Sequence, residues 1–176
     1  MYANLMLMKE QTEGAIKTYI QLLDKTPDNF NSLSQLIELL RRAGRVQDIK
    51  QHITNAETAC QRSNAAGLAF CKGLLSRFSG DPMQALKDLN VARFDNFYGQ
   101  SACIYMVEIY LNPANEMIFS SIGSDSEYNT TPENVVVAKE LIGELQTQGV
   151  DTSILECMAL ISTKEKTQLE QASRNL

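Results

Sequence analysis

His52 is the only histidine of the chain, so it is the one side chain whose ordinary pKa suits general-base chemistry near neutral pH. A catalytic histidine usually needs a carboxylate or carbonyl that orients it and a nucleophile beside it. Asp48 stands four residues earlier, but local spacing places no serine or cysteine next to His52. The pattern predicts an ordinary helix residue, at the surface or partly buried, and assigns no catalytic residue.

Four cysteines are the next candidates for site chemistry. They lie far apart without a CxxC pair, and one histidine beside scattered thiols cannot supply the usual four ligands of a zinc site. Three of them fall among the apolar residues of predicted helices, where a free thiol behaves as a small hydrophobic group. We therefore expect reduced core thiols, no metal and no cofactor. The four positions are Cys60, Cys71, Cys103 and Cys157.

The acidic residues of the predicted helices lack the paired arrangement that raises the pKa of one carboxyl group for acid–base work. Solvated helix faces explain them better than catalysis does. No GxxxxGK[ST], GxGxxG or HExxH motif is present, which removes the common nucleotide-binding and zinc-protease interpretations. The carboxylates considered are Glu38, Glu108, Glu140 and Glu144.

One basic cluster, formed by Arg41, Arg42 and Arg45, marks the end of a predicted helix. Cations near a helix C-terminus interact favourably with the helix dipole, and this is the favoured explanation of the cluster. A contact with an acidic partner is the alternative.

Small and large residues recur along the chain at the spacing of a tetratricopeptide array, whose period is about 34 residues. Ala15, Tyr19 and Pro27 match the A-x3-F…P end of such a repeat. A small residue is needed where two helices of a hairpin cross closely, and a large residue one turn later fills the space beside it. The pattern predicts an all-α, right-handed α-solenoid of stacked helix pairs. Equivalent core positions are predicted at Ile49, Ile53 and Ala56, and then at Gly80, Ala85, Leu89 and Ala92.

About five helix hairpins are predicted, at about 1–26, 28–60, 65–96, 99–149 and 151–176, as one solenoid segment over residues 1–176. The fourth hairpin is interrupted by a long, solvent-exposed loop over 112–131, which is rich in Asn, Ser, Pro, Gly and acidic residues. The chain ends without a polar capping helix, so we expect a piece of a longer array. The expected helices are Tyr2–Lys9, Thr12–Asp24, Phe30–Arg42, Val46–Cys60, Ala66–Phe78, Pro82–Arg93, Ser101–Leu111, Pro132–Gln148 and Thr152–Ser162.

Several positions in these helices have a specific expected role. Gly44 is expected to end its helix in the left-handed conformation, and Asp81 to cap the helix that Pro82 begins. Gly73 and Ala85 are expected in the small slots of the third hairpin. Lys72 falls where the repeat pattern prefers Leu, which predicts a register shifted by one residue.

Composition narrows the class of partners. The net charge of −5 and the pI near 4.9 oppose a surface for nucleic acid or an anionic membrane, because both attract a basic face. No apolar run approaches the roughly 20 residues of a membrane span, and no signal peptide is visible. We expect a cytoplasmic protein without nucleic-acid partners and without direct membrane insertion.

Four stretches resemble the large tetratricopeptide-repeat subunit of intraflagellar transport complex A. The most specific is the EIYLNP run followed by a polar insertion, because a generic repeat would turn straight into its second helix there. The resemblance implies a non-enzymatic solenoid in cilia, associated with the cytoskeleton. It also implies partners among the other complex A subunits, which are mostly propeller-plus-repeat proteins. The stretches are Pro27–Ile49, Phe70–Arg93, Tyr98–Glu116 and Cys157–Ala172.

The function predicted from these observations is a non-enzymatic protein–protein interaction scaffold, part of intraflagellar transport complex A in retrograde ciliary transport and cilium assembly. The alternative is a free-standing tetratricopeptide adaptor that binds a peptide in its concave groove, as a chaperone cofactor or cell-cycle scaffold. Glu38 and Glu108 stand where a chaperone-binding groove needs cations, which opposes that form of the alternative. No partner-binding residue is assigned. The fragment is expected to self-associate through Leu5, Met8, Leu169 and Leu176 at its ends, or to fray at Gln168–Leu176.

Overall fold

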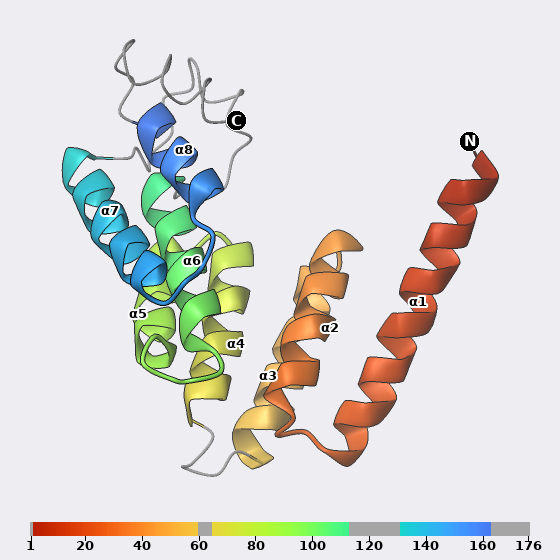
Figure 1. Ribbon diagram of the computed structural model, residues 1–176. Coiled ribbons are helices and arrows are strands. Elements are labelled where there is room, and N and C mark those ends of the chain that lie inside the picture. The colour runs from red at the N-terminus through yellow and green to blue at the C-terminus, as the bar shows by residue number, and fades with distance from the viewer. Residues whose placement is uncertain (1, 60–64, 113–130, 163–176) are drawn as a thin grey trace. The chain divides into compact units, whose positions relative to one another are not determined.

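The computed structural model describes residues 2–59, 65–112 and 131–162, with the backbone alone for residues 2–10. Every regular element in these ranges is a helix (Figure 1). The chain divides into two compact units, unit 1 over Met1–Ala92 and unit 2 over Arg93–Leu176. Unit 1 contains helices α1 to α5, and unit 2 contains α6 to α8. The all-α fold of helix pairs is as predicted, whereas one continuous right-handed array over all pairs remains a prediction.

Helix bounds agree with the sequence prediction to within two residues for α2 to α8. Helix α6 ends at Leu111 and α7 begins at Pro132, which are the expected borders of the long interruption. The interruption itself, the connector after Cys60 and the second helix of the fifth hairpin lie outside the described residues. The helices are α1 (Tyr2–Lys25), α2 (Phe30–Arg42), α3 (Val46–Ala59), α4 (Ala65–Phe78), α5 (Pro82–Ala92), α6 (Gly99–Leu111), α7 (Pro132–Thr147) and α8 (Ser153–Ser162).

Side-chain caps begin three of the helices. The Asp81 carboxylate accepts a hydrogen bond from the Gln84 backbone N–H at 3.0 Å, as predicted for the start of α5. Asn29 and Thr131 accept in the same way from backbone N–H groups three residues later, at the starts of α2 and α7. These bonds satisfy amide donors that the helix itself leaves unpaired.

Glycines with positive φ end three helices. Gly44 follows α2 with φ 72°, as predicted, and the Arg45 N–H then donates to the Leu40 carbonyl at 2.8 Å. Gly80, with φ 83°, ends α4 in the same way. The prediction that Gly80 occupies a core position is therefore wrong, because Gly80 is exposed in the turn that joins α4 to α5.

The expected break in the first hairpin is also absent. Helix α1 runs without interruption through Glu10 and Gln11, where the sequence analysis separated Tyr2–Lys9 from Thr12–Asp24. No proline stands in this stretch, and Gln, Glu and Lys are good helix formers. Gly14 by itself costs too little to stop a helix of 24 residues. The first predicted hairpin is thus a single helix.

Two glycines of α4 permit close helix approaches in unit 1. A Cβ atom added to Gly67 would lie 2.8 Å from the Phe30 side chain of α2, and one added to Gly73 would lie 2.7 Å from the Leu89 Cγ of α5. Real Cβ atoms do not approach other atoms so closely, so each helix pair packs against bare backbone. Gly73 therefore occupies a small slot as predicted. Its partner is Leu89, one turn beyond the fully buried Ala85.

Lys72 lies between two buried residues of α4, Cys71 and Gly73. Its ammonium group pairs with Glu57 of α3 at 2.5 Å, and both side chains are partly exposed. The position where the repeat pattern prefers Leu thus lies at the edge of the buried face, and the neighbouring residues fill the interior.

Unit 2 has its own apolar core. Ala102, Met106 and Val107 of α6 are buried, as are residues of α7 and α8. A polar link joins the last two helices, because the Gln146 amide of α7 donates to the Thr152 hydroxyl at 3.0 Å, just before α8. The buried residues of α7 are Val135, Ala138, Leu141, Ile142 and Leu145, and those of α8 are Leu155, Cys157 and Ala159.

We expect Gly73→Ala to destabilise the protein by about 1–3 kcal/mol, because the new methyl group overpacks the crossing with Leu89. Gly14→Ala is the matched control, since Gly14 is also helical but no atom lies within 4 Å of its added Cβ. This control should be stabilised by about 0.5–1 kcal/mol through helix propensity alone. Urea unfolding of both variants measures the difference, and equal effects of the two substitutions would contradict the close crossing.

Candidate interaction surfaces

His52 lies half-buried on α3, in the vicinity of two acidic residues. Burial lowers the pKa of His52 from its ordinary value, while the negative charges of Asp24 and Asp48 act in the opposite direction. Within the described part of the chain no hydrogen bond joins His52 to a serine, threonine or cysteine. The structure thus places the histidine where the sequence predicted, on a helix and partly buried.

Three cysteines are free thiols buried in the helices, namely Cys71, Cys103 and Cys157. The Cys71 thiol donates to the Phe30 carbonyl oxygen at 3.6 Å, and burial raises the pKa of this thiol. The prediction of core thiols is confirmed for these three, and Cys60 lies outside the described residues. No cluster of three or more potential metal ligands occurs within 2–59, 65–112 and 131–162.

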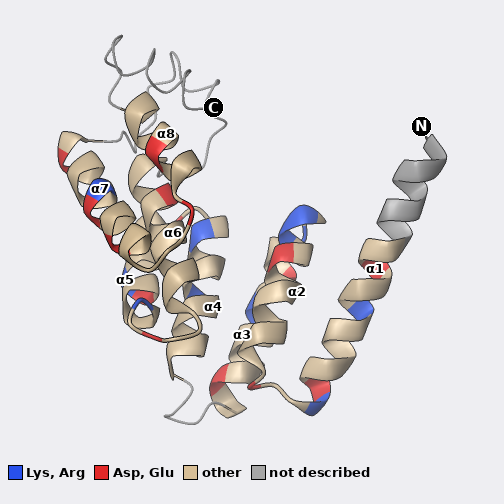
Figure 2. Cartoon of the chain, in the orientation of Figure 1, with Lys and Arg blue, Asp and Glu red and all other residues tan. Residues whose placement is uncertain are grey.

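The arginines at the end of α2 are matched by carboxylates of unit 1 (Figure 2). Arg41 pairs with Glu38 at 2.9 Å, and its guanidinium also stacks over the Phe78 ring at 5.0 Å. Arg45 pairs with Asp48 at 2.7 Å and with Glu13 of α1 at 3.5 Å. These contacts favour a role within the fold over a contact with an acidic partner. Each pair is exposed, so its contribution to stability is small.

The remaining carboxylates considered above do not form a common site. Glu144 of α7 forms an ion pair with Arg93. Glu140 is exposed on the same helix, and Glu108 is half-buried on α6.

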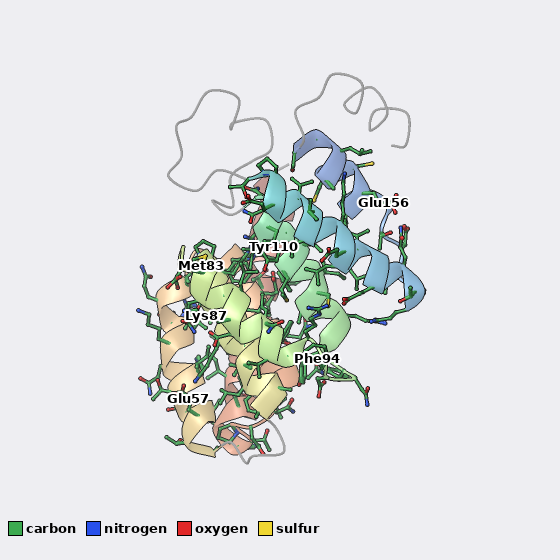
Figure 3. The ribbon with its side chains drawn as sticks, turned by 90° about the vertical axis from the view of Figure 1, so that its left-hand side faces the viewer. Glu57, Met83, Lys87, Phe94, Tyr110 and Glu156 are labelled. Carbon is green, nitrogen blue, oxygen red and sulfur yellow. The ribbon has the colours of Figure 1, made fainter. Side chains whose placement is uncertain are left out.

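The turn between α5 and α6 carries two strongly exposed aromatic side chains, one of them the most exposed large apolar side chain among the described residues. We call residues Arg93–Tyr98 the aromatic turn. Phe94 is 80% exposed and Phe97 is 66% exposed; Phe94 is labelled in Figure 3. Large exposed apolar groups close together in the sequence are candidates for an interaction site.

Hydrogen bonds hold the aromatic turn in one conformation. One carboxylate oxygen of Asp95 accepts from the backbone N–H groups of Phe97 and Tyr98, at 2.8 and 3.0 Å. The Gly99 N–H donates to the Asp95 carbonyl at 2.9 Å, where α6 begins. The two phenylalanines are therefore presented by an ordered turn, which reduces the entropy lost on binding.

Arg93 joins this turn to α7. Its guanidinium stacks over the Phe94 ring at 5.3 Å and pairs with Glu144. The hydrogen bond with Glu144 raises the pKa of Arg93. Glu144 thus compensates this cation, and the one other charged group of the turn is the Asp95 carboxylate, which accepts from two backbone N–H groups. A partner surface that fits it is apolar.

The aromatic turn is not among the sites predicted from the sequence. The sequence feature that could have indicated it is the group Phe94, Phe97 and Tyr98 in a short connection between helices, where polar residues are usual. Helical periodicity identifies the buried faces of helices, and it therefore does not detect aromatic residues in the turn between two helices.

The paired helices, the close small-residue crossings and the exposed turn define a helical-repeat protein of the tetratricopeptide or armadillo class. A family model described as the TT21 fifth ARM repeats domain matches residues 1–111. The chain therefore belongs to this family, and the family recognised from the sequence is confirmed.

Named relatives extend the similarity over nearly the whole chain. Tetratricopeptide repeat protein 21A of Homo sapiens is 37% identical over 97% of this chain and 14% of its own length. Tetratricopeptide repeat protein 21B of Homo sapiens is 37% identical over 80% of this chain and 12% of its own length. A tetratricopeptide repeat protein 21 homolog of Caenorhabditis elegans is 28% identical over 77% of the chain. The chain thus spans about one seventh of the length of the relatives that it matches most fully.

In the part of the chain that the structure describes, no helix combines the length and the apolar character that crossing a membrane requires.

The lowered pKa of His52 predicts a pH-dependent stability. The unfolded chain takes up a proton near pH 6.5, before the folded protein does, so the free energy of unfolding should fall as the pH is lowered from about 7.5 to about 5.5. His52→Gln should remove this part of the dependence. Urea unfolding at several pH values measures it, and equal slopes for both proteins would contradict the partly buried, predominantly neutral histidine.

Proposed function

We propose that this chain acts as a non-enzymatic protein–protein interaction scaffold. The observation that carries the proposal is the family match over residues 1–111, on a chain whose described part consists of packed helix pairs. Such pairs form extended surfaces from many repeats, and each repeat is held by its neighbours. Function would then depend on the shape of these surfaces rather than on a catalytic group.

The finer proposal is that the scaffold belongs to intraflagellar transport complex A, in retrograde ciliary transport and cilium assembly. Its support is the EIYLNP segment and the other stretches described above, together with the similarity to tetratricopeptide repeat proteins 21A and 21B. The proposed partners are the propeller-plus-repeat subunits of that complex, and the proposed location is the cilium.

The aromatic turn is the surface that we propose for a contact with such a partner. Phe94 and Phe97 are large, rigid side chains that the fold leaves in solvent. Aromatic anchors of this kind dominate the energetics of many protein interfaces. The adaptor alternative has less support, because Glu38 pairs with Arg41 at a position where a clamp for peptide carboxylates needs a free cation.

We expect Ala85→Glu in the full-length protein to abolish partner binding and incorporation into cilia. Ala85 is fully buried, so a glutamate there overpacks α5 and buries an unpaired charge at a cost of about 3 kcal/mol or more. His52→Ala should leave both properties intact. Co-purification from ciliated cells compares the two variants. Loss of binding by a normally folded His52→Ala protein would favour site chemistry, and co-purification of chaperones would favour an adaptor.

A second variant tests the surface without disturbing the core. We expect Phe94→Ser combined with Phe97→Ser to reduce co-purification of transport subunits about tenfold or more, with an unchanged melting temperature, because both rings are exposed. Ile154→Ser is the control, since Ile154 is an exposed apolar residue elsewhere in unit 2. If the double variant binds as well as the wild type, the aromatic turn is not part of the interface.

A further inference from the structure

Two helices each carry one exposed charge flanked by exposed apolar residues or a glycine, and the two charges are opposite. On α5 of unit 1, Met83 is 62% exposed and Val91 is 61% exposed. Lys87, also exposed, lies between them at a spacing of four residues. Residues four apart lie on one side of a helix. Met83 and Lys87 are labelled on this helix in Figure 3. We call Met83, Lys87 and Val91 the basic stripe.

On α7 of unit 2, Val136 is 57% exposed and Glu140 follows four residues later in an exposed position. Gly143 continues the same side of the helix, and no atom lies within 4 Å of a Cβ added there. We call Val136, Glu140 and Gly143 the acidic stripe. It belongs to the helix on which acidic residues stand out in Figure 2.

The two stripes are complementary in charge and in size. Neither Lys87 nor Glu140 forms an ion pair with another residue of the described ranges. If the helices dock in antiparallel fashion with Lys87 opposite Glu140, the long Met83 faces the open surface at Gly143. Val91 then faces Val136. Groups four residues apart in each stripe are separated by about 6 Å along the axis, and Gly143 lies about 4.5 Å beyond Glu140, because a helix rises about 1.5 Å per residue.

We propose that the basic stripe of one copy of this chain binds the acidic stripe of a second copy. Both stripes are exposed within the chain, apart from the partly exposed Gly143, so each is available to another molecule. Pairing two basic stripes would bring Lys87 against Lys87, and like charges across an interface are unfavourable. The interface is therefore heterologous, with a different surface contributed by each copy.

The small size of the stripes determines how strong this association is. Three side chains per copy cover much less than the roughly 800 Å² that each partner buries in a standard stable interface. The contact is accordingly weak for two isolated copies. The contact becomes stronger overall where several copies are held close together, because linking raises the effective concentration of each binding surface for the next.

Sedimentation velocity of the 176-residue chain over a range of concentrations tests the proposal. The wild-type chain should self-associate reversibly at high micromolar concentrations, more weakly as salt is added. Lys87→Glu alone and Glu140→Lys alone should each raise the concentration needed for association by roughly tenfold or more. Lys50→Glu is the control with the same change of charge, at an exposed position of α3, and it should associate like the wild type.

Mixing the two charge-reversed proteins is the decisive experiment. Each pairing between a Lys87→Glu copy and a Glu140→Lys copy joins opposite charges, so association should return to at least the wild-type level. The chain that carries both substitutions should also self-associate. A strictly monomeric wild-type chain would overturn the proposal, as would association unaffected by either single substitution. The latter result would indicate that the copies associate through the aromatic turn, the chain ends or another surface.

Discussion

The approach of α4 to its neighbours is the constraint on which unit 1 depends. Gly67 meets Phe30 and Gly73 meets Leu89 at distances that no Cβ atom allows. Helix α4 thereby packs against a helix of the preceding pair and against its own partner. A glycine inside a helix lowers helix stability by about 0.5–1 kcal/mol relative to alanine. Here the close packing of buried Phe30 and Leu89 compensates for that loss.

The groups that usually carry chemistry are used for structure in this chain. The three described cysteines fill buried helix positions, and the arginines at and just after the end of α2 pair with carboxylates of unit 1. Burial favours the neutral form of His52. Phe94, Phe97 and Met83 instead leave large apolar surface in solvent. A scaffold has this distribution, because binding by surface contact requires exposed apolar groups on a rigid support.

Rigidity of the support comes from local hydrogen bonds at helix ends. Asp95 orders the aromatic turn, Asp81 begins α5, and glycines of positive φ end α2 and α4. Each of these devices acts within a few residues of the chain. Together these hydrogen bonds and turns fix the positions of the exposed side chains, so that each exposed side chain does not need a large core beneath it.

The sequence by itself determined the helices of α2 to α8, because caps, turn glycines and apolar periodicity act over a few residues. It failed at α1, where Thr12 was taken as a helix start although nothing interrupts the helix before it. It also placed Gly80 in the core, because the spacing of Gly80 in the sequence matches that of a small core residue. In the structure Gly80 is a turn glycine. The family and the fold class were therefore predictable from the sequence. The structural roles of individual residues within a repeat were less predictable.

Only the tertiary structure decided which residues meet. Arg45 and Glu13 are 32 residues apart, and Arg93 and Glu144 are 51 apart, so no local pattern joins them. The partner of Gly73 depends on how α4 and α5 cross, which places Leu89 rather than Ala85 against it. Whether Phe94 is buried or exposed depends likewise on what the folded helices cover. Such facts arise from the packing of distant segments, which a sequence pattern over one or two helical turns does not contain.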